Sequence, residues 1–352
     1  MSERSDPSES GNALLQVDEL RMHFPVTRGV LLQRVIGQVR AVDGVTFSVN
    51  QGETFGLVGE TGCGKSTTGR LIAGYLSPTA GTVTFDGNQL GRSRPHAAEP
   101  NRREIQLIAQ DPYSSLNPRH QVGNILSAPF RYQKLTPPGG VKQAVLGLLD
   151  QVGLRPADYN RFPDDFSGGQ RQRIVIARAI AVRPRMIVAD EPVSALDVSV
   201  RAQILNLLDD LQKQYGLTYL FISHDLSVVR HIADHVAVMY LGKIVEIASR
   251  DRLYAQPRHP YTHALLSAAP IPDPRAKTRI KIRLTGEVPS PLNPPSACRF
   301  HPRCWKAQEI CRTVEPKLTV DQPGHLVACH FPDVAPPGTG PGVGRAGAGL
   351  TA

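Results

Sequence analysis

Residues 54–67 read TFGLVGETGCGKST, and this stretch decides the fold. Its first part is a short apolar run between turn residues, which predicts a buried strand over 54–59. Glycines in the following loop let backbone N–H groups converge on phosphate oxygens, and the N-terminus of the next helix adds partial positive charge. The stretch therefore predicts a phosphate-binding loop with the spacing GxxxxGKS/T. The loop consists of Gly59, Glu60, Thr61, Gly62, Cys63, Gly64, Lys65, Ser66 and Thr67.

Two residues of this loop carry the expected chemistry. Lys65 would hold the β- and γ-phosphates of a nucleotide, and Ser66 would place its hydroxyl on Mg²⁺. Cys63 is interpreted as a small loop residue rather than a nucleophile. The alternative is a glycine-rich turn without a ligand, and the flanking strand and helix patterns argue against it.

A second motif, MIVADE at 186–191, is an apolar strand that ends in two acids. This arrangement lets Asp190 reach the Mg²⁺ while Glu191 polarises the attacking water. Adjacent carboxylates at a strand end are by themselves more often a solvated turn. The phosphate loop upstream favours the functional interpretation, because both motifs end neighbouring strands of one sheet in nucleotide-binding α/β proteins.

Strand and helix patterns alternate along the chain, which predicts an α/β fold with a mostly parallel core sheet. The helical block between the strand ending at Gln110 and the strand ending at Asp190 looks like a subdomain inserted into the sheet order. The expected strands are 54–59, 82–87, 105–110, 186–190, 218–224, 235–240 and 243–248, and the expected helices are 141–153, 171–182 and 200–216.

The composition of the 352 residues, 41% apolar and 20% charged, is that of a globular protein with a real core. The net charge of +9 is spread along the chain, which favours a basic polyphosphate-binding enzyme over a nucleic-acid-binding protein. We find neither a secretory signal nor eighteen consecutive apolar residues, so we expect a cytosolic chain that reaches a membrane only by docking on another protein. The polar N-terminus and the Pro/Gly/Ala-rich tail are expected to be disordered.

Four of the five cysteines, Cys298, Cys304, Cys311 and Cys329, are gathered near the C-terminus. In a reducing compartment this grouping favours metal over disulfides, and four thiolates suit an iron–sulfur cluster or zinc. They are separated by five, six and seventeen residues, so the close pair that is usual at zinc sites is absent. Should one cysteine not be a ligand, the possible substitutes are His301, His325 and His330.

The stretch Phe166-Ser167-Gly168-Gly169-Gln170, followed by RQRIVIARAI, separates this chain from other phosphate-loop proteins. Here the sequence resembles the ABC ATPase family, whose signature loop is usually written LSGGQ; the match covers 167–170, and Phe166 departs from the usual leucine. Physically, Ser and Gly at a helix start form a second anion cradle. The resemblance implies that two half-sites facing head to tail enclose two ATP molecules.

The resemblance also implies an ABC-type P-loop ATPase fold: a core parallel sheet, an antiparallel β subdomain, an inserted helical subdomain and a small C-terminal metal-binding extension. Its other loops match in order. Gln110 resembles the Q-loop glutamine that senses Mg²⁺ and water, Ser194-Ala195-Leu196-Asp197 resembles the D-loop at the dimer interface, and His224 resembles the switch histidine. Phe24 is either the residue that stacks on adenine or a core phenylalanine.

The roles that follow from these matches fall into three sets. The expected catalytic residues are Lys65, Gln110, Glu191 and His224, and the expected Mg²⁺ ligands are Ser66, Gln110 and Asp190. The expected nucleotide-binding residues are Phe24, Gly59, Glu60, Thr61, Gly62, Cys63, Gly64, Lys65, Ser66, Thr67, Gln110, Ser167, Gly168, Gly169, Gln170, Asp190 and Asp197.

The phrases AQDPYSSLNPR, RHPYTHALLSAAP and GEVPSPLNPPSACRFHPRC narrow the resemblance to the ATPase subunits of oligopeptide and dipeptide importers, over roughly residues 14–331. Some of these subunits hold a [4Fe–4S] cluster in a C-terminal extension. The resemblance therefore favours iron–sulfur at Cys298, Cys304, Cys311 and Cys329, with a structural or regulatory role. Zinc and bare thiols are the alternatives.

The resemblance predicts an ABC ATPase domain over 13–257 and the extension over 258–331, between disordered ends at 1–12 and 332–352. It implies a peripheral protein at the cytoplasmic face of the cell membrane. The expected partners are a second, different ABC ATPase subunit, two transmembrane permeases and an extracytoplasmic solute-binding protein, without nucleic acid. Alternatives are a soluble ABC ATPase not coupled to transport, an importer subunit for nickel or another small solute, and a regulatory metal-binding protein.

Overall fold

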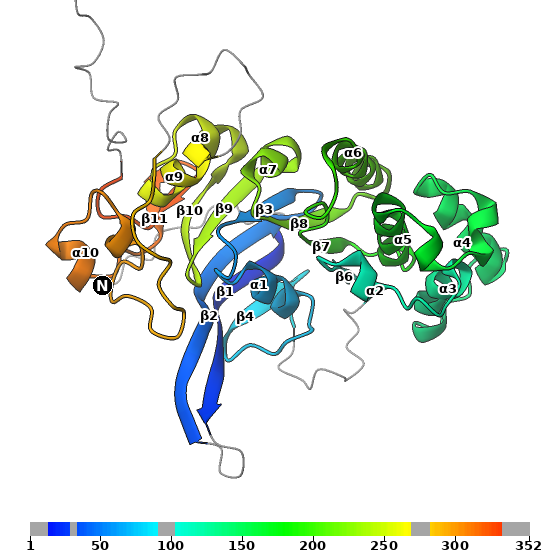
Figure 1. Ribbon diagram of the computed structural model, residues 1–352, viewed down its shortest axis with the longest axis horizontal. Helices are drawn as coiled ribbons and strands as arrows, with labels where there is room; N and C mark the ends of the chain where they lie inside the picture. The colour runs from blue at the N-terminus through cyan, green and yellow to red at the C-terminus, as the bar shows by residue number, and fades with distance from the viewer. Residues whose placement is uncertain (1–12, 29–33, 91–102, 269–281, 333–352) are drawn as a thin grey trace, which may run out of the picture.

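Two β-sheets and several groups of helices make up the protein (Figure 1). The computed structural model describes residues 13–28, 34–90, 103–268 and 282–332. The larger sheet runs through the middle of the molecule, with a block of helices at one end and the C-terminal segments at the other. The ends predicted to be disordered lie outside the described residues, apart from Pro332.

The larger sheet has eight strands in the order β11-β12-β10-β9-β3-β8-β7-β6. Strands β9, β3, β8, β7 and β6 are parallel, so the predicted parallel core is confirmed, and β10, β12 and β11 continue the sheet antiparallel. The strands are β3 (Thr54–Val58), β6 (Ile105–Ile108), β7 (Met186–Asp190), β8 (Thr218–Ser223), β9 (His235–Tyr240), β10 (Lys243–Ser249), β11 (Thr319–Gln322) and β12 (His325–Val327).

The central strands are apolar along their whole length because both faces of the sheet are covered. Successive side chains of β7 show this, since they alternate between two hydrophobic cores: Met186 and Val188 lie in one core, and Ile187 and Ala189 lie in the other. The helices that accompany the parallel strands are α1 (Lys65–Ile72), α6 (Val198–Tyr215) and α7 (Leu226–Ile232).

A second, antiparallel sheet has the order β2-β1-β4-β5 and fits the predicted antiparallel subdomain. Its two long strands form a hairpin that projects from the body in Figure 1. The strands are β1 (Ala13–Arg28), β2 (Arg34–Asn50), β4 (Ala80–Phe85) and β5 (Asn88–Gln89). Strands β1 and β2 were not among the expected strands.

The helical block lies between β6 and β7 in the chain, as predicted, and the structure places it at one end of the molecule (Figure 1). Its elements are α2 (Pro112–Ser115), α3 (Val122–Tyr132), α4 (Gly140–Gln151), the 3₁₀ turns η2 (Pro156–Asn160) and η3 (Pro163–Asp165), and α5 (Gly168–Ile180). Helix α5 begins within the signature loop, at Gly168, and returns the chain toward β7.

The C-terminal segments are built onto the larger sheet. Strand β12 pairs with β10, and the buried carboxylate of Glu246 on β10 accepts hydrogen bonds from the backbone N–H groups of Arg258 and His259 and lies 2.7 Å from the ring of His325. One buried acid thus ties three separate segments together. The elements are α8 (Arg250–Ala255), α9 (Pro260–Ala268), η4 (His301–Arg303) and α10 (Glu309–Thr313).

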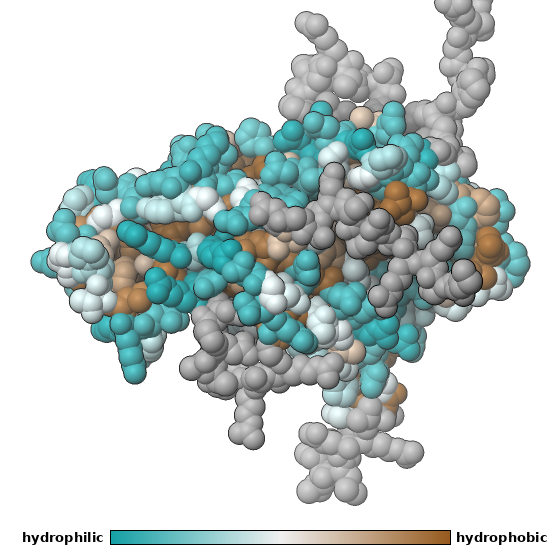
Figure 2. Space-filling view, turned by 180° about the vertical axis from the view of Figure 1, so that it is seen from behind, coloured by the Kyte–Doolittle hydropathy of each residue, from teal (hydrophilic) through white to brown (hydrophobic). Residues whose placement is uncertain are grey.

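Among the described residues, no helix is long and apolar enough to span a membrane. Seen from behind the view of Figure 1, the surface of the molecule is largely hydrophilic, and hydrophobic residues appear in separate areas (Figure 2).

Candidate functional site

The phosphate loop connects β3 to α1 and has a backbone that only glycine accommodates at its tightest points. Gly64 has a φ of 110°, in the left-handed region, and a Cβ there would lie 2.0 Å from the carbonyl oxygen of Ala41. A Cβ on Gly59 would lie 2.1 Å from the carbonyl oxygen of Met239. The loop is therefore wedged against the backbones of β2 and β9, while Gly62 has open space beside it.

Lys65 is buried at the start of α1. Its ammonium donates hydrogen bonds to the carbonyl oxygens of Gly59, at 2.8 Å, and Glu60, at 3.0 Å. The positive charge is thus held against the loop by the loop's own backbone, in the place expected for a phosphate-binding lysine.

Ser66 and Asp190 meet although they lie far apart in the sequence. The hydroxyl of Ser66 donates to a carboxylate oxygen of Asp190 over 2.9 Å. Burial raises the pKa of the Asp190 carboxyl, so its charged form gains from a nearby cation. Hydroxyl and carboxylate oxygens are the donors that Mg²⁺ prefers, and the pair fits the predicted ion.

Glu191 is the centre of the predicted catalytic group. One of its carboxylate oxygens accepts a hydrogen bond from Gln110 Nε2 at 3.0 Å, and the other lies 3.0 Å from His224 Nδ1. Glu191 is buried, and its φ of 49° is unusual for a residue with a side chain. Such strained backbone clusters at active sites, where the surrounding structure holds it in place.

The parallel sheet explains why these residues converge. Val58 pairs with Ser223, and Ile222 pairs with Asp190, so the adjacent strands β3, β8 and β7 end at the same level. The segments after these ends are the phosphate loop, Glu191 and His224, and Gln110 follows β6 beyond β7. In parallel α/β sheets ligands bind at this carboxyl edge.

The signature loop lies beside the D-loop. Ser167 caps α5, accepting from the Gln170 N–H while the Gln170 side chain accepts from the Ser167 N–H. A Cβ on Gly169 would lie 2.4 Å from the side chain of Val200, whose own N–H is capped by Asp197. Among the described residues, no hydrogen bond or ion pair joins the signature to the phosphate loop. Phe166 is buried under the guanidinium of Arg161, so the larger ring serves as an apolar anchor.

Two predicted nucleotide-binding residues stand apart from this arrangement. Phe24 is half-buried on β1 opposite Val39 and belongs to neither hydrophobic core, and its stacking on adenine stays a prediction. The backbone N–H of Glu60 donates a hydrogen bond to the Tyr261 hydroxyl at 2.9 Å. The Glu60 carboxylate forms an ion pair with Arg303 at 2.9 Å. Sequence analysis missed Tyr261 and Arg303, because no local pattern links them to a loop some two hundred residues earlier.

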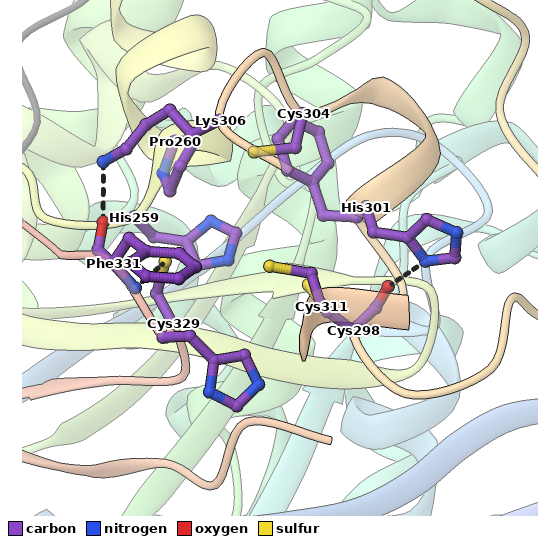
Figure 3. A pocket seen from close by; sticks show the side chains of 11 residues that line it. His259, Pro260, Cys298, His301, Cys304, Lys306, Cys311, Cys329 and Phe331 are labelled. Atoms are coloured by element: carbon purple, nitrogen blue, oxygen red, sulfur yellow. Dashed lines mark hydrogen bonds between the residues drawn. The ribbon is translucent and has the colours of Figure 1, made fainter. Parts of the chain in front are cut away.

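The four C-terminal cysteines line one pocket, together with His259, His301, Lys306 and His330 (Figure 3). Burial raises the pKa of Cys298 to about 12 and that of Cys329 to about 11. Among the described residues, however, no group of three or more His, Cys, Asp or Glu side chains could hold a metal ion. The prediction of a metal-binding extension is therefore not supported by these side chains. His325 bonds Glu246 instead and is absent from the pocket lining.

Comparisons with known proteins agree with the geometry. Residues 42–194 match the family model of ABC transporters, and residues 245–311 match the model of the oligopeptide/dipeptide transporter C-terminal region. The chain is 49% identical over 320 residues to the oligopeptide transport ATP-binding protein AppF of Bacillus subtilis, covering 90% of this chain and 97% of that protein. It is also 49% identical to the dipeptide transport ATP-binding protein DppF of Escherichia coli, covering 91% and 95%.

Solved structures show the same fold. CbiO1 of Clostridium perfringens, part of the ABC transporter complex cbiONQ, has a TM-score of 0.58 at 26% identity, covering 69% of this chain and 91% of that chain. The ABC transporter cassette MJ0796 has a TM-score of 0.59 at 24% identity, covering 67% and 98%, and shows the fold alone. The phosphate loop, the paired acids and the extended similarity lead to one conclusion: the chain belongs to the ABC transporter family, as an ATP-binding protein of the oligopeptide/dipeptide transport branch.

Proposed function

We propose that this chain hydrolyses ATP and thereby drives the import of dipeptides or oligopeptides. The observation that carries the proposal is the placement of Glu191 between Gln110 and His224, beside the Ser66–Asp190 pair. The similarity to peptide transport ATP-binding proteins over most of the chain supports the substrate class.

The proposed reaction transfers the γ-phosphoryl group to water. Lys65 and the loop N–H groups hold the phosphates, while Ser66 and Asp190 hold Mg²⁺, which when bound neutralises phosphate charge. The oxygen of the attacking water bonds to the γ-phosphorus while Glu191 accepts a proton from that water. The bond between the γ-phosphorus and the β–γ bridging oxygen breaks, which releases ADP and phosphate. Both partners of Glu191 leave lone pairs on its oxygens free to accept from that water.

Half of the site comes from a second ATPase chain in this proposal. The bonds of the signature loop are local, and its helix start offers Ser167 and N–H groups to a phosphate held elsewhere. A head-to-tail dimer brings this cradle onto the partner's nucleotide. We propose a different ATPase subunit as that partner.

Docking on membrane permeases completes the proposed assembly, at the cytoplasmic face of the membrane and with an extracytoplasmic solute-binding protein. The helical block offers a surface for it: Tyr113, three residues after Gln110, is 63% exposed, and Tyr132 is 85% exposed. Exposed aromatic side chains of this kind are enriched at protein interfaces. Contact there would link the permease to Gln110 and so to Glu191.

Uptake of labelled peptides by cells that lack this chain tests the function. We expect di- or oligopeptide uptake to fall to background and to return with the wild-type chain but not with a variant unable to hydrolyse ATP. Retained peptide uptake with lost nickel uptake would assign the chain to a nickel importer. If neither changes, the proposed coupling to transport is wrong.

We further propose that the cysteine pocket holds a [4Fe–4S] cluster. The donor set fits the cluster: four thiols, of which Cys311 is buried and the other three are partly buried, line the pocket without a carboxylate among them. The charge of the Lys306 side chain complements thiolates. Within the described chain, Arg303 Nε and Trp305 Nε1, on either side of Cys304, are buried donors without an acceptor. A cluster is wider than a single ion, so its ligands need not converge as ion ligands do. It would cross-link the extension, in a structural or regulatory role.

Iron and sulfide analysis of anaerobically purified protein tests the cluster. We expect about four of each per chain. Replacing Cys311 by serine should remove most of the iron, because it deletes one of four ligands, while the matched Cys63→Ser variant should keep it. Zinc without iron, or iron unaffected by Cys311→Ser, would show that the proposal is wrong.

A further inference from the structure

Glu60 of the phosphate loop is held at three points. Its N–H donates to the Tyr261 hydroxyl, its carbonyl oxygen accepts from Lys65 Nζ, and its carboxylate accepts from Arg303 Nη1 at 2.9 and 3.2 Å. Two of the three partners, Tyr261 and Arg303, come from the chain after β10. The loop that carries the nucleotide lysine is therefore shaped in part by the C-terminal segments.

The Arg303–Glu60 pair is well shielded from water. The side chain of Arg303 is 9% exposed and that of Glu60 is 26% exposed. Charge-assisted hydrogen bonds in such surroundings are stronger than exposed ion pairs, which contribute little. The Tyr240 hydroxyl also lies 3.5 Å from Arg303 Nη1 and helps to fix the guanidinium.

Three aromatic side chains pack together next to this ion pair. The ring of Tyr240 is 4.7 Å from that of Tyr261 and 5.3 Å from that of Phe300, and Phe300 is 5.4 Å from Tyr261 between ring centroids. All three are buried, and Phe300 also lines the cysteine pocket. A rigid packed unit thus joins the cysteine pocket to the residue that holds the Glu60 N–H.

A second arginine of the same segment holds the other side of the site. Arg299 is buried, donates to the carbonyl oxygen of Leu241 and pairs with Asp43 on β2. Asp43 lies two residues after Ala41, whose carbonyl oxygen abuts Gly64. Both arginines stand within the seven-residue run CRFHPRC, from Cys298 to Cys304, so two of the four cysteines bracket them.

We propose that Arg303 is a positioning residue for ATP, because by fixing Glu60 it sets the shape of the phosphate loop. The affinity for ATP then depends on whether the cysteine-bearing segment 298–304 is held in this conformation. The proposal rests on the ATPase activity and needs no particular occupant of the cysteine pocket. Arg303 acts through Glu60 and Lys65 rather than on the reacting atoms, so its loss should weaken nucleotide binding more than it slows the chemical step.

The test compares Arg303→Met with Arg312→Met in the purified full chain. Methionine keeps the unbranched aliphatic bulk and removes the charge. Arg312 is an exposed arginine on the nearby helix α10, 3.9 Å from Glu309. We expect Arg303→Met to raise the KM for MgATP and its Kd about tenfold, the effect of losing one shielded charged hydrogen bond, with kcat changed less than about twofold. Arg312→Met should match the wild type.

Two further variants separate positioning from general destabilisation. Arg303→Lys keeps a donor for Glu60 and should recover most of the affinity. Glu60→Gln removes the ion pair from the loop side and should raise KM as Arg303→Met does, with no further rise when the two are combined. If the Arg303→Met variant fails to fold, the KM of the Glu60→Gln variant for MgATP tests the proposal by itself. An unchanged KM in Glu60→Gln, or additive effects in the double variant, would overturn the proposal.

Iron content measured on the same samples keeps this proposal distinct from that of the cluster. A chain without iron that still shows the Arg303 effect would refute the cluster and leave the positioning role intact. If the Arg303→Met variant retains iron and its KM for MgATP is unchanged, the cluster is supported and the positioning role of Arg303 is refuted.

Discussion

Replacing Glu191 by glutamine will lower the rate of ATP hydrolysis by about 10²–10⁴-fold while MgATP still binds. Glutamine has the same shape and can keep partners at Gln110 and His224, which lie 3.0 Å from the carboxylate. It lacks the basicity to take a proton from the attacking water. The loss should therefore appear in kcat and leave the nucleotide affinity within about threefold.

Phosphate release and equilibrium MgATP binding on the purified chain measure the two effects separately. Glu104→Gln is the matched control, because Glu104 is 41% exposed and lies 3.7 Å from Arg185 at the surface. It should hydrolyse ATP at the wild-type rate. Activity of Glu191→Gln within a few fold of wild type would mean that another group accepts the proton, and His224 would be the first to examine.

Replacing Gly64 by alanine will lower the affinity for nucleotide by about 10²-fold or more. The new Cβ would meet the Ala41 carbonyl oxygen at 2.0 Å, and backbone cannot give way as a side-chain tip does. The φ of 110° adds strain of its own. Together these cost about 3 kcal/mol or more in the ligand-binding conformation, a factor of ~10² or more in affinity.

Gly74→Ala provides the control for backbone strain alone. Gly74 follows α1 with a φ of 72°, and a Cβ there would meet nothing within 4 Å. We expect a loss of about 1–2 kcal/mol in the free energy of unfolding, without a loss of nucleotide binding. Titration calorimetry with MgATP and thermal unfolding of both variants make the comparison. Equal nucleotide affinity in the two variants would show that contact with β2 does not shape the loop.

Much of the fold could be predicted because its signals are local. The central strands are apolar runs of five or six residues, and the helix patterns place 141–153, 171–182 and 200–216 close to α4, α5 and α6. The sequence patterns did not predict the long hairpin of β1 and β2. Its pairing contains several register shifts, which interrupt the strict alternation that marks a strand.

The candidate site was predictable to the extent that its residues sit in motifs with fixed spacing. Ser66 and Asp190 were expected to share an ion, and their side chains meet at 2.9 Å. The resemblance to ABC ATPases also grouped Gln110 and His224 with Glu191. Their contacts follow from parallel strands that end at one level, a property of the sheet order β3-β8-β7-β6 that motif spacing only implies.

By itself the sequence determined the phosphate loop, the paired acids, the signature and the cysteine group, because in each of these the chemistry lies in residues close together along the chain. Only the tertiary structure decided that β12 pairs with β10 and extends the larger sheet, that Glu246 connects three segments, and that Arg303 binds the carboxylate of Glu60. These contacts join residues 79, 12 and 243 positions apart. The physical reason is that long-range pairing depends on which surfaces packing brings together, and no local pattern encodes it.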